Sequence, residues 1–574
     1  MDKTRIDNIF TNGRSLVIPF FQRSYVWKEE NWERFLQDMK YVSSEKKDYF
    51  LGTYIMKQQT TNSTDTIGDI RTVIDGQQRF TTILLFFYVL YKKNDKYEDF
   101  KQIFFNRNKE IILHHNHNDI EIFNLIMNDF IISENDDTNK KEVERIKKEY
   151  RNSLVFKAYN YFQEEIKDIN SYNINTLLNK LYFVGIDIQA NEDEQQIFDT
   201  INSLGVRLTT AELLKNELFD GNDLALYKRT WQECFEKNND VKEFWDSEVT
   251  SGRIKRTNID LFLYSYLVIN YEKEFTVEKL FNSFKEYLKE KDYKNNKETI
   301  LSNITSYAEK YYKHVNVNCC TEPLRDKTDF ISRLNIVMFG LETTTLLPYF
   351  LYLLKEIQDV QKLNQIFSFL EKYIIRRFIS KEVNKGYNNL FSSLIRNGIK
   401  TEESLKEYIY KKETTSKMPS DDDMINTLNN YDHDNTIAKG ILYLLEISMR
   451  TDSDNTTLLS LNKYDLEHIM PKKWNLHWNN FDFNNESLVN NREKHIKLLG
   501  NKTILTSKLN KSIKNADWKT KKEGNKKYGG YLQYAKGLKT FNFEQIDDWN
   551  ENKIDNRTTE LFEKIKQVWS YDNI

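Results

Sequence analysis

A short segment near the end of the chain holds residues that could hydrolyse a phosphodiester. It reads YDLEHIMP at 464–471, and Asn510 follows further along. The reaction needs a base to activate water, a hard cation on the phosphate, and positive charge for the nucleic-acid backbone. His468 can be the base because the ordinary pKa of histidine lies near neutrality. Glu467 and Asn510 offer oxygen ligands for Mg²⁺. Taken alone, a histidine beside a glutamate is more often a surface or core pair.

Positive charge is concentrated around these residues. Residues 491–540 contain 14 Lys and Arg against 3 Asp and Glu, a local excess of +11 in a chain whose net charge is −2. Exposed lysines bind phosphates without reading base sequence. We expect five of them to contact DNA, namely Lys508, Lys511, Lys514, Lys521 and Lys522. The alternative is an ordinary solvated, lysine-rich surface.

A second segment, VIDGQQRFTT at 73–82, could cradle a phosphate. It predicts a strand, a tight turn at Gly76 and then a buried helix, because glycine permits backbone conformations closed to other residues. The helix start would present free N–H groups that favour an anion. Arg79 can bind a phosphate with its guanidinium fork, and Gln77 and Gln78 supply neutral donors and acceptors. A solvated strand–helix connection is the alternative that the spacing leaves open.

Three more segments accompany this turn: IPFFQRSYVW at 18–27, FLG at 50–52 and IFDTINSLGVRLTTAELLKN at 197–216. Together they resemble the ParB/sulfiredoxin-like N-terminal domain of GmrSD-type restriction enzymes, over about residues 1–220. The resemblance implies binding and hydrolysis of an NTP, with its base (GTP, ATP or CTP) left open. The implied nucleotide-binding residues are Gln22, Arg23, Asp75, Gly76, Gln77, Gln78 and Arg79, with Asn202 and Lys215 as weaker candidates.

Three aromatic residues beside the first of these segments allow two interpretations. Tyr25, Trp27 and Trp32 could stack a base or line a pocket for a modified base. Such residues are more often core anchors of a small α+β domain, and we favour that reading.

The C-terminal segments resemble the HNH, or ββα-metal, nuclease domain that ends GmrSD-type proteins. After EHIMP come LGN at 499–501, then Asn510, then WKTKK at 518–522. The resemblance makes His468 the general base, Glu467 and Asn510 metal ligands, and Asn501 the asparagine that orients the histidine loop. Many HNH enzymes have Asp at the first ligand position or His at the last, so Asp465 could share the metal role.

Recognisable elements must position these residues. Strands are predicted at 16–19, 49–57, 72–74 and 182–189, and helices at 31–40, 210–219 and 362–380. Five prolines and 17 glycines in 574 residues favour long helices. The predicted fold class is α+β and mainly α. It comprises a ParB/sulfiredoxin-like domain at 1–220, a helical linker or sensor domain at 221–450, and a ββα-metal (HNH) domain at 451–574.

The composition of the chain limits the classes of protein to which it can belong. A chain with 39% hydrophobic and 14% aromatic residues is not wholly disordered. Its longest apolar run, 83–91, is too short to cross a bilayer, and no secretory signal is visible. Three cysteines cannot make a disulfide framework. We expect a reduced, soluble, cytoplasmic protein with no membrane partner, and a homo-oligomer is left open.

These features together predict a nucleotide-regulated, modification-dependent DNA endonuclease of phage defence. It would use Mg²⁺ or another divalent cation and an NTP, and nick or cut double-stranded DNA from phage or carrying a modification. The alternative is a nucleotide-dependent sensor or partner-binding protein whose HNH domain is vestigial or acts on RNA.

Overall fold

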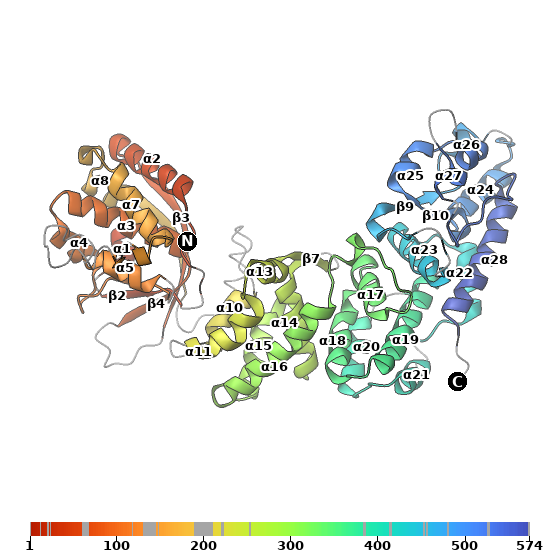
Figure 1. Cartoon of the computed structure of the whole chain (residues 1–574), viewed down its shortest axis with the longest axis horizontal. Helices are drawn as coiled ribbons and strands as arrows, with labels where there is room; N and C mark the ends of the chain where they lie inside the picture. Colours follow the sequence, from red (N-terminus) through yellow and green to blue (C-terminus); the bar gives the residue numbers. More distant parts are fainter. Residues whose placement is uncertain are drawn as a thin grey trace. The chain divides into compact units, whose positions relative to one another are not determined.

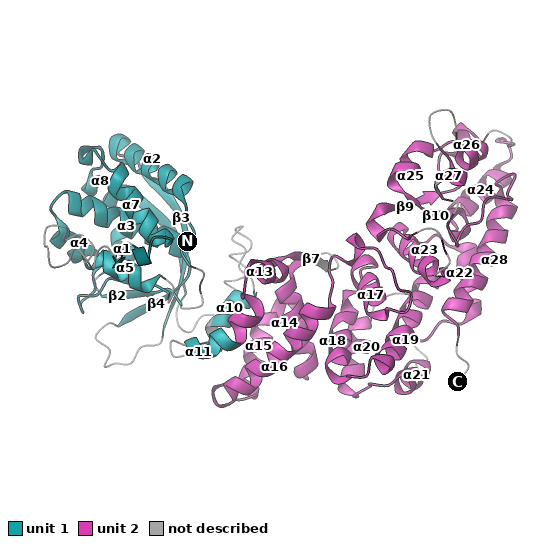
Figure 2. Cartoon of the chain, in the orientation of Figure 1, with its two compact units in different colours: residues 1–229 teal, residues 230–574 magenta. Residues whose placement is uncertain are grey.

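Figure 1 shows the computed structural model of the protein. It describes residues 2–571 except 12, 20–21, 23, 60–67, 117–118, 130–144, 147, 189–209, 220–222, 252–253, 383–385, 412–415, 452–453, 455–456, 479–480, 525–528 and 536. The chain forms two compact units, residues 1–229 and 230–574, which Figure 2 colours separately. Within the described residues, no helix combines the length and the apolar character needed to cross a bilayer.

The first unit is built on a mixed sheet of six described strands in the order β1-β6-β3-β4-β2-β5. The strands are β1 (Asp2–Arg5), β2 (Arg14–Val17), β3 (Tyr49–Gln58), β4 (Asp69–Asp75), β5 (Leu113–His114) and β6 (Leu181–Ile188). The strands predicted at 49–57 and 72–74 are confirmed as β3 and β4. The strand predicted at 16–19 ends earlier, at Val17, because Pro19 has no N–H to continue a ladder.

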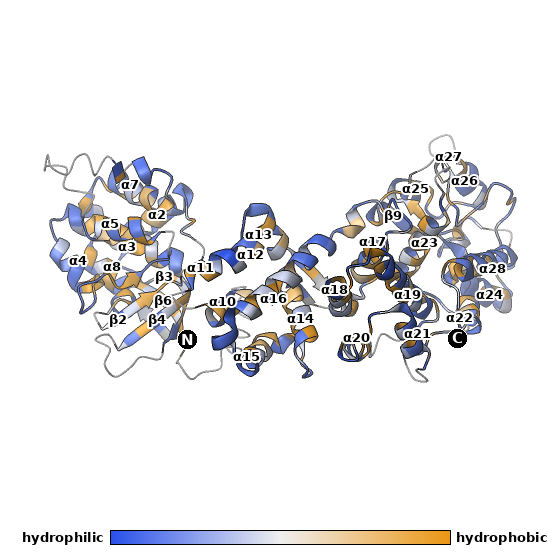
Figure 3. Ribbon diagram, turned by 60° about the horizontal axis from the view of Figure 1, so that its bottom comes forward, coloured by the Kyte–Doolittle hydropathy of each residue, from blue (hydrophilic) through white to orange (hydrophobic). Residues whose placement is uncertain are grey.

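Helices cover one face of this sheet (Figure 3). They are α1 (Ile6–Ile9), α2 (Glu29–Glu45), α3 (Gln77–Lys93), α4 (Tyr97–Phe104), α5 (Ile120–Met127), α7 (Leu154–Glu165) and α8 (Ile174–Lys180). Two further helices, α10 (Thr210–Leu218) and α11 (Leu224–Tyr227), follow in the chain and are not part of this layer. Helix α3 is apolar on every side and is enclosed from Phe80 to Tyr91. It therefore forms the centre of the core, and its first turn is held rigidly at the end of β4. The helices predicted at 31–40 and 210–219 are confirmed as α2 and α10.

The second unit begins with helices. They are α12 (Glu233–Phe235), α13 (Asn239–Asp246), α14 (Asn258–Asn270), α15 (Leu280–Glu290), α16 (Tyr293–His314), α17 (Phe330–Asn335), α18 (Leu347–Glu356), α19 (Val360–Ile379), α20 (Tyr387–Arg396), α21 (Glu402–Tyr410), α22 (Asp421–Asn430) and α23 (Asn435–Met449). A short hairpin of β7 (Glu248–Ser251) and β8 (Ile254–Thr257) interrupts them. The helix predicted at 362–380 is confirmed as α19.

The same unit ends in a small α/β part. Its strands are β9 (Tyr464–His468) and β10 (Lys502–Thr506), and its helices are α24 (Glu486–Lys497), α25 (Ser507–Ile513), α26 (Trp518–Glu523), α27 (Tyr531–Tyr534) and α28 (Glu551–Val568). Just after α28, the indole of Trp569 donates to the Glu371 carboxylate on α19 (2.8 Å), and Arg333 also binds that carboxylate. The end of the chain is thereby fastened into the helical part of the unit.

Candidate functional site

Two paired strands and a helix position the catalytic candidates. Strands β9 and β10 are antiparallel, with His468 opposite Lys502 and Glu467 opposite Thr503. Helix α25 follows β10 directly and carries Asn510. This strand–strand–helix arrangement brings Glu467 and His468 close to Asn510, although a long stretch of sequence separates them.

These residues share one pocket of about 360 Å³. It is lined by Glu467, His468, Pro471, Lys472, Asn510, Lys511, Lys514 and Asn515. The candidate base, two candidate metal ligands and three lysines therefore face one space. Sequence reasoning missed Lys472, which is exposed just beyond Pro471, because it lies outside the basic stretch used as the signal.

His468 is held in its neutral form. Burial, followed by the nearby charges of Lys502 and Lys472, lowers the pKa of His468 to about 3. No hydrogen bond joins its ring to another residue in the described part of the chain. A neutral imidazole that lines a pocket keeps a nitrogen lone pair for a proton, while the lowered pKa makes it a weaker base than a free histidine.

Asn501 fixes the turn that follows His468. Its backbone carbonyl accepts from the N–H of Ile469 (2.9 Å). Its side-chain oxygen accepts from the N–H of Met470 (2.8 Å) and the indole of Trp549 (3.0 Å), and its amide nitrogen donates to the Met470 carbonyl (2.8 Å). Asn501 is fully buried, so these bonds define one backbone path for the turn. This geometry suits the orienting role that the resemblance implies.

Glu467 and Lys521 form a buried ion pair. The Lys521 ammonium binds Oε1 of Glu467 and donates to the His468 carbonyl (2.9 Å). Tyr531 donates to the same Oε1 (3.5 Å). Burial raises the pKa of Glu467 and lowers that of Lys521, while their mutual attraction opposes both shifts. The prediction that Lys521 contacts DNA is wrong, because its side chain is fully enclosed.

The other predicted DNA-contacting lysines divide into two groups. Lys522 is half-buried and donates to the Ile546 carbonyl (2.8 Å), which engages one of its three N–H groups and leaves its predicted DNA contact untested. Lys508, Lys511 and Lys514 are exposed on or beside α25. These three are the most accessible candidates for phosphate contacts from the predicted set.

Asp465 supports Asn510 rather than lining the pocket. Its carboxylate accepts from the Ser507 hydroxyl (2.9 Å) and from the Asn510 amide nitrogen (3.5 Å). Because a carboxylate can only accept hydrogen bonds, the Asn510 amide turns its nitrogen toward Asp465. The amide oxygen of Asn510 then points away from Asp465. The suggested metal role of Asp465 is therefore not favoured by its position.

The donor set fits a hard cation that keeps several waters. Within the described residues there is no group of three or more His, Cys, Asp or Glu side chains suited to a metal. The pocket instead offers the carboxylate of Glu467, which lines it although Lys521 binds its Oε1, and the amide oxygen of Asn510. Oxygen donors with water completing the shell are what Mg²⁺ prefers.

The predicted phosphate turn in the first unit has the expected backbone. Gly76 adopts φ 103°, and a Cβ there would lie 3.0 Å from Tyr54 Cβ. Helix α3 begins at Gln77, and its N-cap residue, Gly76, has no side chain with which to cap the first N–H groups. Arg79 donates to the Thr53 carbonyl (3.0 Å) and lies 4.0 Å from the Asp75 carboxylate.

The two glutamines of this turn are buried. Gln78 accepts from the N–H of Val26 (2.8 Å) and donates to the Ser24 carbonyl (3.3 Å), so it ties down the neighbouring segment instead of offering itself to a phosphate. Gln77 donates to Oε1 of Gln22 (3.4 Å), while its own oxygen has no partner in the described part of the chain. The predicted ligand role of Gln78 is corrected to a structural one.

The remaining predicted nucleotide residues are placed as follows. Arg23 and Asn202 lie outside the described residues. Lys215 lies on α10, as the predicted helix required. Tyr25 and Trp32 are core residues, joined by a hydrogen bond from the Trp32 indole to the Tyr25 hydroxyl (2.9 Å).

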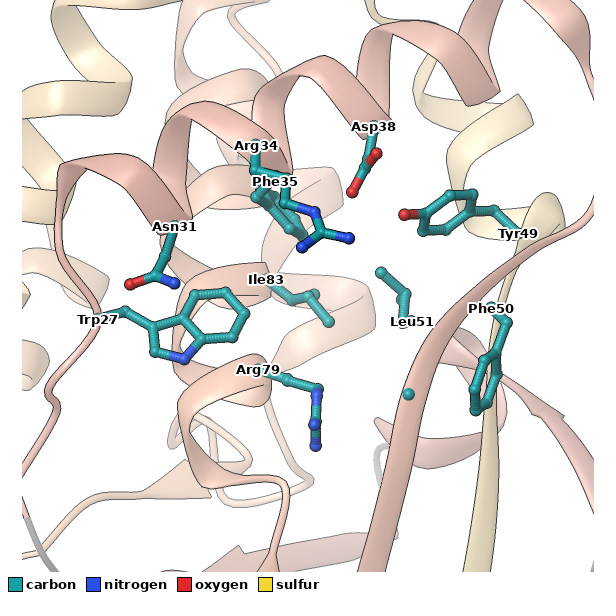
Figure 4. Close-up of a pocket in the computed structure, with 11 residues that line it drawn as sticks. Trp27, Asn31, Arg34, Phe35, Asp38, Tyr49, Phe50, Leu51, Arg79 and Ile83 are labelled. Carbon is teal, nitrogen blue, oxygen red and sulfur yellow. The ribbon is translucent and has the colours of Figure 1, made fainter. Parts of the chain in front are cut away.

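Trp27 agrees with the favoured core interpretation only in part, because it packs against the core of the first unit and also lines a pocket. It is only half-buried and lines a second pocket, of about 380 Å³, shown in Figure 4. The lining is Trp27, Asn31, Arg34, Phe35, Asp38, Tyr49, Phe50, Leu51, Gly52, Arg79 and Ile83. Three of the segments that resemble the family meet here, because Trp27, Gly52 and Arg79 each come from a different one.

Sequence comparison identifies the class of protein that these two sites belong to. Residues 6–219 match the family described as GmrSD restriction endonuclease, N-terminal domain, and residues 418–564 match GmrSD restriction endonucleases, C-terminal domain. No curated protein matches the chain. The protein is therefore a restriction endonuclease, a DNA-cleaving enzyme of phage defence. With both domains matched in order over well over half of its length, the chain belongs to the GmrSD family. The second match begins at 418, so α22 and α23 belong with the nuclease part.

Proposed function

We propose that the chain is a nucleotide-regulated, Mg²⁺-dependent endonuclease of the HNH type that cleaves DNA at the pocket beside His468. One observation carries the proposal. His468, Glu467 and Asn510 line the same pocket as Lys511 and Lys514. A base, hard oxygen donors and phosphate-binding cations in one space are the parts that phosphodiester hydrolysis requires.

Each residue then has a defined task. His468 takes a proton from water, whose oxygen attacks phosphorus while the P–O bond to the leaving sugar oxygen breaks. Glu467 and Asn510 would hold Mg²⁺, which supplies charge stabilisation for the phosphate and the leaving oxygen. Lys511 and Lys514 hold the DNA backbone at the pocket, and Asn501 keeps the histidine turn in place.

Nucleotide regulation is proposed for the first unit. The N-terminus of α3, which Gly76 does not cap, and the Arg79 guanidinium support it, since both favour a phosphate. Dependence on a DNA modification is proposed from the family resemblance, as is hydrolysis of the NTP.

One experiment tests the whole proposal. Purified protein is incubated with modified and unmodified phage DNA, with Mg²⁺ and each NTP in turn. We expect cleavage that needs Mg²⁺, depends on an NTP, and falls roughly 10²–10⁴-fold in His468→Ala. A matched control is His477→Ala, an exposed histidine outside the pocket. NTP binding without cleavage of any DNA would favour the alternative of a sensor with a vestigial nuclease.

A further inference from the structure

The pocket between α2 and β3 is large enough for a small ligand and has several aromatic walls. Its volume of about 380 Å³ falls in the range of about 300–1,000 Å³ that small-molecule sites occupy. Trp27, Phe35, Tyr49 and Phe50 line it. Phe50 is 56% exposed, which is unusual for a phenylalanine that has a core nearby. Planar aromatic walls beside an opening suit a ligand with a flat ring.

Two opposite charges on α2 face this space without neutralising each other. Arg34 and Asp38 are one turn apart, a spacing at which such residues commonly pair. Neither an ion pair nor a hydrogen bond joins the Arg34 guanidinium to any residue in the described ranges. Asp38 accepts from the Tyr49 hydroxyl, and burial together with this bond raises the pKa of Tyr49 to about 12. Figure 4 shows Arg34, Asp38 and Tyr49 converging at one end of the pocket.

Arg79 connects the pocket to the start of α3. Its guanidinium lies against Gly52, where a Cβ would come within 2.7 Å of Arg79 Nε. Gly52 also has φ 119°, a conformation that favours glycine. The backbone of β3 is thus shaped to let Arg79 lie across it. Figure 4 shows Trp27 and Arg79 toward the end of the pocket away from Asp38. A phosphate bound by Arg79 at the first turn of α3 would leave its nucleoside beside Trp27.

We propose that this pocket holds the base of a guanine nucleotide, with Arg34 and Asp38 reading its two edges. Arg34 only donates and Asp38 only accepts. Guanine presents two acceptors, O6 and N7, that suit an arginine fork, and two donors, the N1–H and the 2-amino group, that suit a carboxylate. Adenine, cytosine and uracil each lack one of these paired edges. The inference rests on the proposed nucleotide binding and adds the base and the residues that select it.

The test separates the base from the phosphates. Dissociation constants are measured by calorimetry on the full chain for GTP, ATP, CTP, UTP and inorganic tripolyphosphate. The variants are Asp38→Asn, Arg34→Gln and Trp27→Phe, with Glu30→Gln as the control, an exposed acidic residue on α2 outside the pocket lining. Thermal unfolding verifies that each variant is folded.

We expect the wild type and Glu30→Gln to bind GTP more tightly than the other three. Asp38→Asn and Arg34→Gln should each reduce that preference roughly tenfold or more, as for a lost hydrogen bond to a charged group. Their affinity for tripolyphosphate should stay unchanged. Trp27→Phe keeps an aromatic wall and should retain most of the preference.

Two results would overturn the inference in distinguishable ways. If nucleotides and tripolyphosphate bind but Asp38→Asn and Arg34→Gln leave the preference for GTP intact, or if no such preference exists, the base pocket is wrong and nucleotide binding stands. If neither a nucleotide nor tripolyphosphate binds to the wild type, both proposals are wrong.

Discussion

The ammonium of Lys521 is bound to the carboxylate of Glu467 inside the C-terminal core, and it also donates to the backbone carbonyl of His468. One buried cation thus contacts both the candidate metal ligand and the residue that carries the candidate base. Because Lys521 uses one carboxylate oxygen, it also limits how Glu467 can turn toward the pocket.

Removing this cation should damage both folding and cleavage. Lys521→Met leaves the buried Glu467 charge without its cation, a change that costs about 3–5 kcal/mol in comparable pairs. The free energy of unfolding of the second unit, followed by urea titration, should fall accordingly. The double variant Lys521→Met/Glu467→Gln should recover most of the stability but not the cleavage. Recovery of cleavage in the double variant would exclude Glu467 as a metal ligand.

The histidine turn should depend on Asn501. Asn501→Ala leaves the buried backbone groups of the turn and the Trp549 indole without partners, each worth about 1–3 kcal/mol. We expect lower stability and a cleavage rate reduced at least as much as by other orienting residues, roughly tenfold to hundredfold. Cleavage by Asn501→Ala at the wild-type rate, measured well below its melting temperature, would contradict the orienting role.

DNA affinity should depend on salt through the exposed lysines of α25. Replacing Lys508, Lys511 and Lys514 by Gln should reduce the slope of log K against log salt by roughly 3, about one per phosphate contact. The control replaces three exposed lysines of the helical part, Lys289, Lys291 and Lys294. An equal effect in both triple variants would place the DNA path elsewhere.

Arg79 should set nucleotide affinity. Arg79→Ala removes a charge-assisted contact to phosphate worth about 1.5–3 kcal/mol, so NTP affinity should fall roughly tenfold to hundredfold. Gly52→Ala should act in the same direction, because the added Cβ displaces Arg79 and the backbone is in the left-handed region. Calorimetry with tripolyphosphate measures both effects directly. Unchanged tripolyphosphate affinity would mean that the turn at Gly76 only connects β4 to α3 and binds no phosphate.

Acid should loosen the first unit through His115. Burial lowers the pKa of His115 from 6.5 to about 3, and the ring contacts the Thr81 hydroxyl (2.9 Å). Between these two pKa values the unfolded chain binds a proton at His115, whereas the folded unit does not. Stability from this group is therefore complete above about pH 6.5 and is lost progressively toward pH 3, by several kcal/mol in order of magnitude. Hydrogen exchange of α3 between pH 7 and 4 should show the loss, and His115→Gln should flatten it relative to His477→Gln.

Much of the nuclease pocket could be predicted because its residues lie in short, ordered motifs. Residue type and spacing identified His468 and Asn510. The pairing of β9 with β10 then brings them together, because α25, which carries Asn510, follows β10 directly. Lys521 could not be placed in this way. It sits in a basic stretch that reads as solvated, and only the tertiary contact with Glu467 on β9 reveals that it is buried.

The first unit shows the same limit. Gly76 was predicted from local backbone requirements alone, and the structure agrees. Gln78 has a side chain that could bind a phosphate, yet it hydrogen-bonds to the backbone of residues 24 and 26, which lie far from it in the sequence. Arg34 and Asp38 look like the solvent face of an amphipathic helix, and only the approach of β3 makes them part of a pocket.

The anchoring of Trp569 on Glu371 changes what kind of module the nuclease is. After α23 the chain builds the strands and the catalytic turn, and just after α28 Trp569 hydrogen-bonds to Glu371 on α19. The nuclease part is therefore held to the preceding helices of the second unit by the Trp569 contact as well as by the continuous chain. A hinge motion that separated the nuclease part from α19 would have to break the hydrogen bond between Trp569 and Glu371.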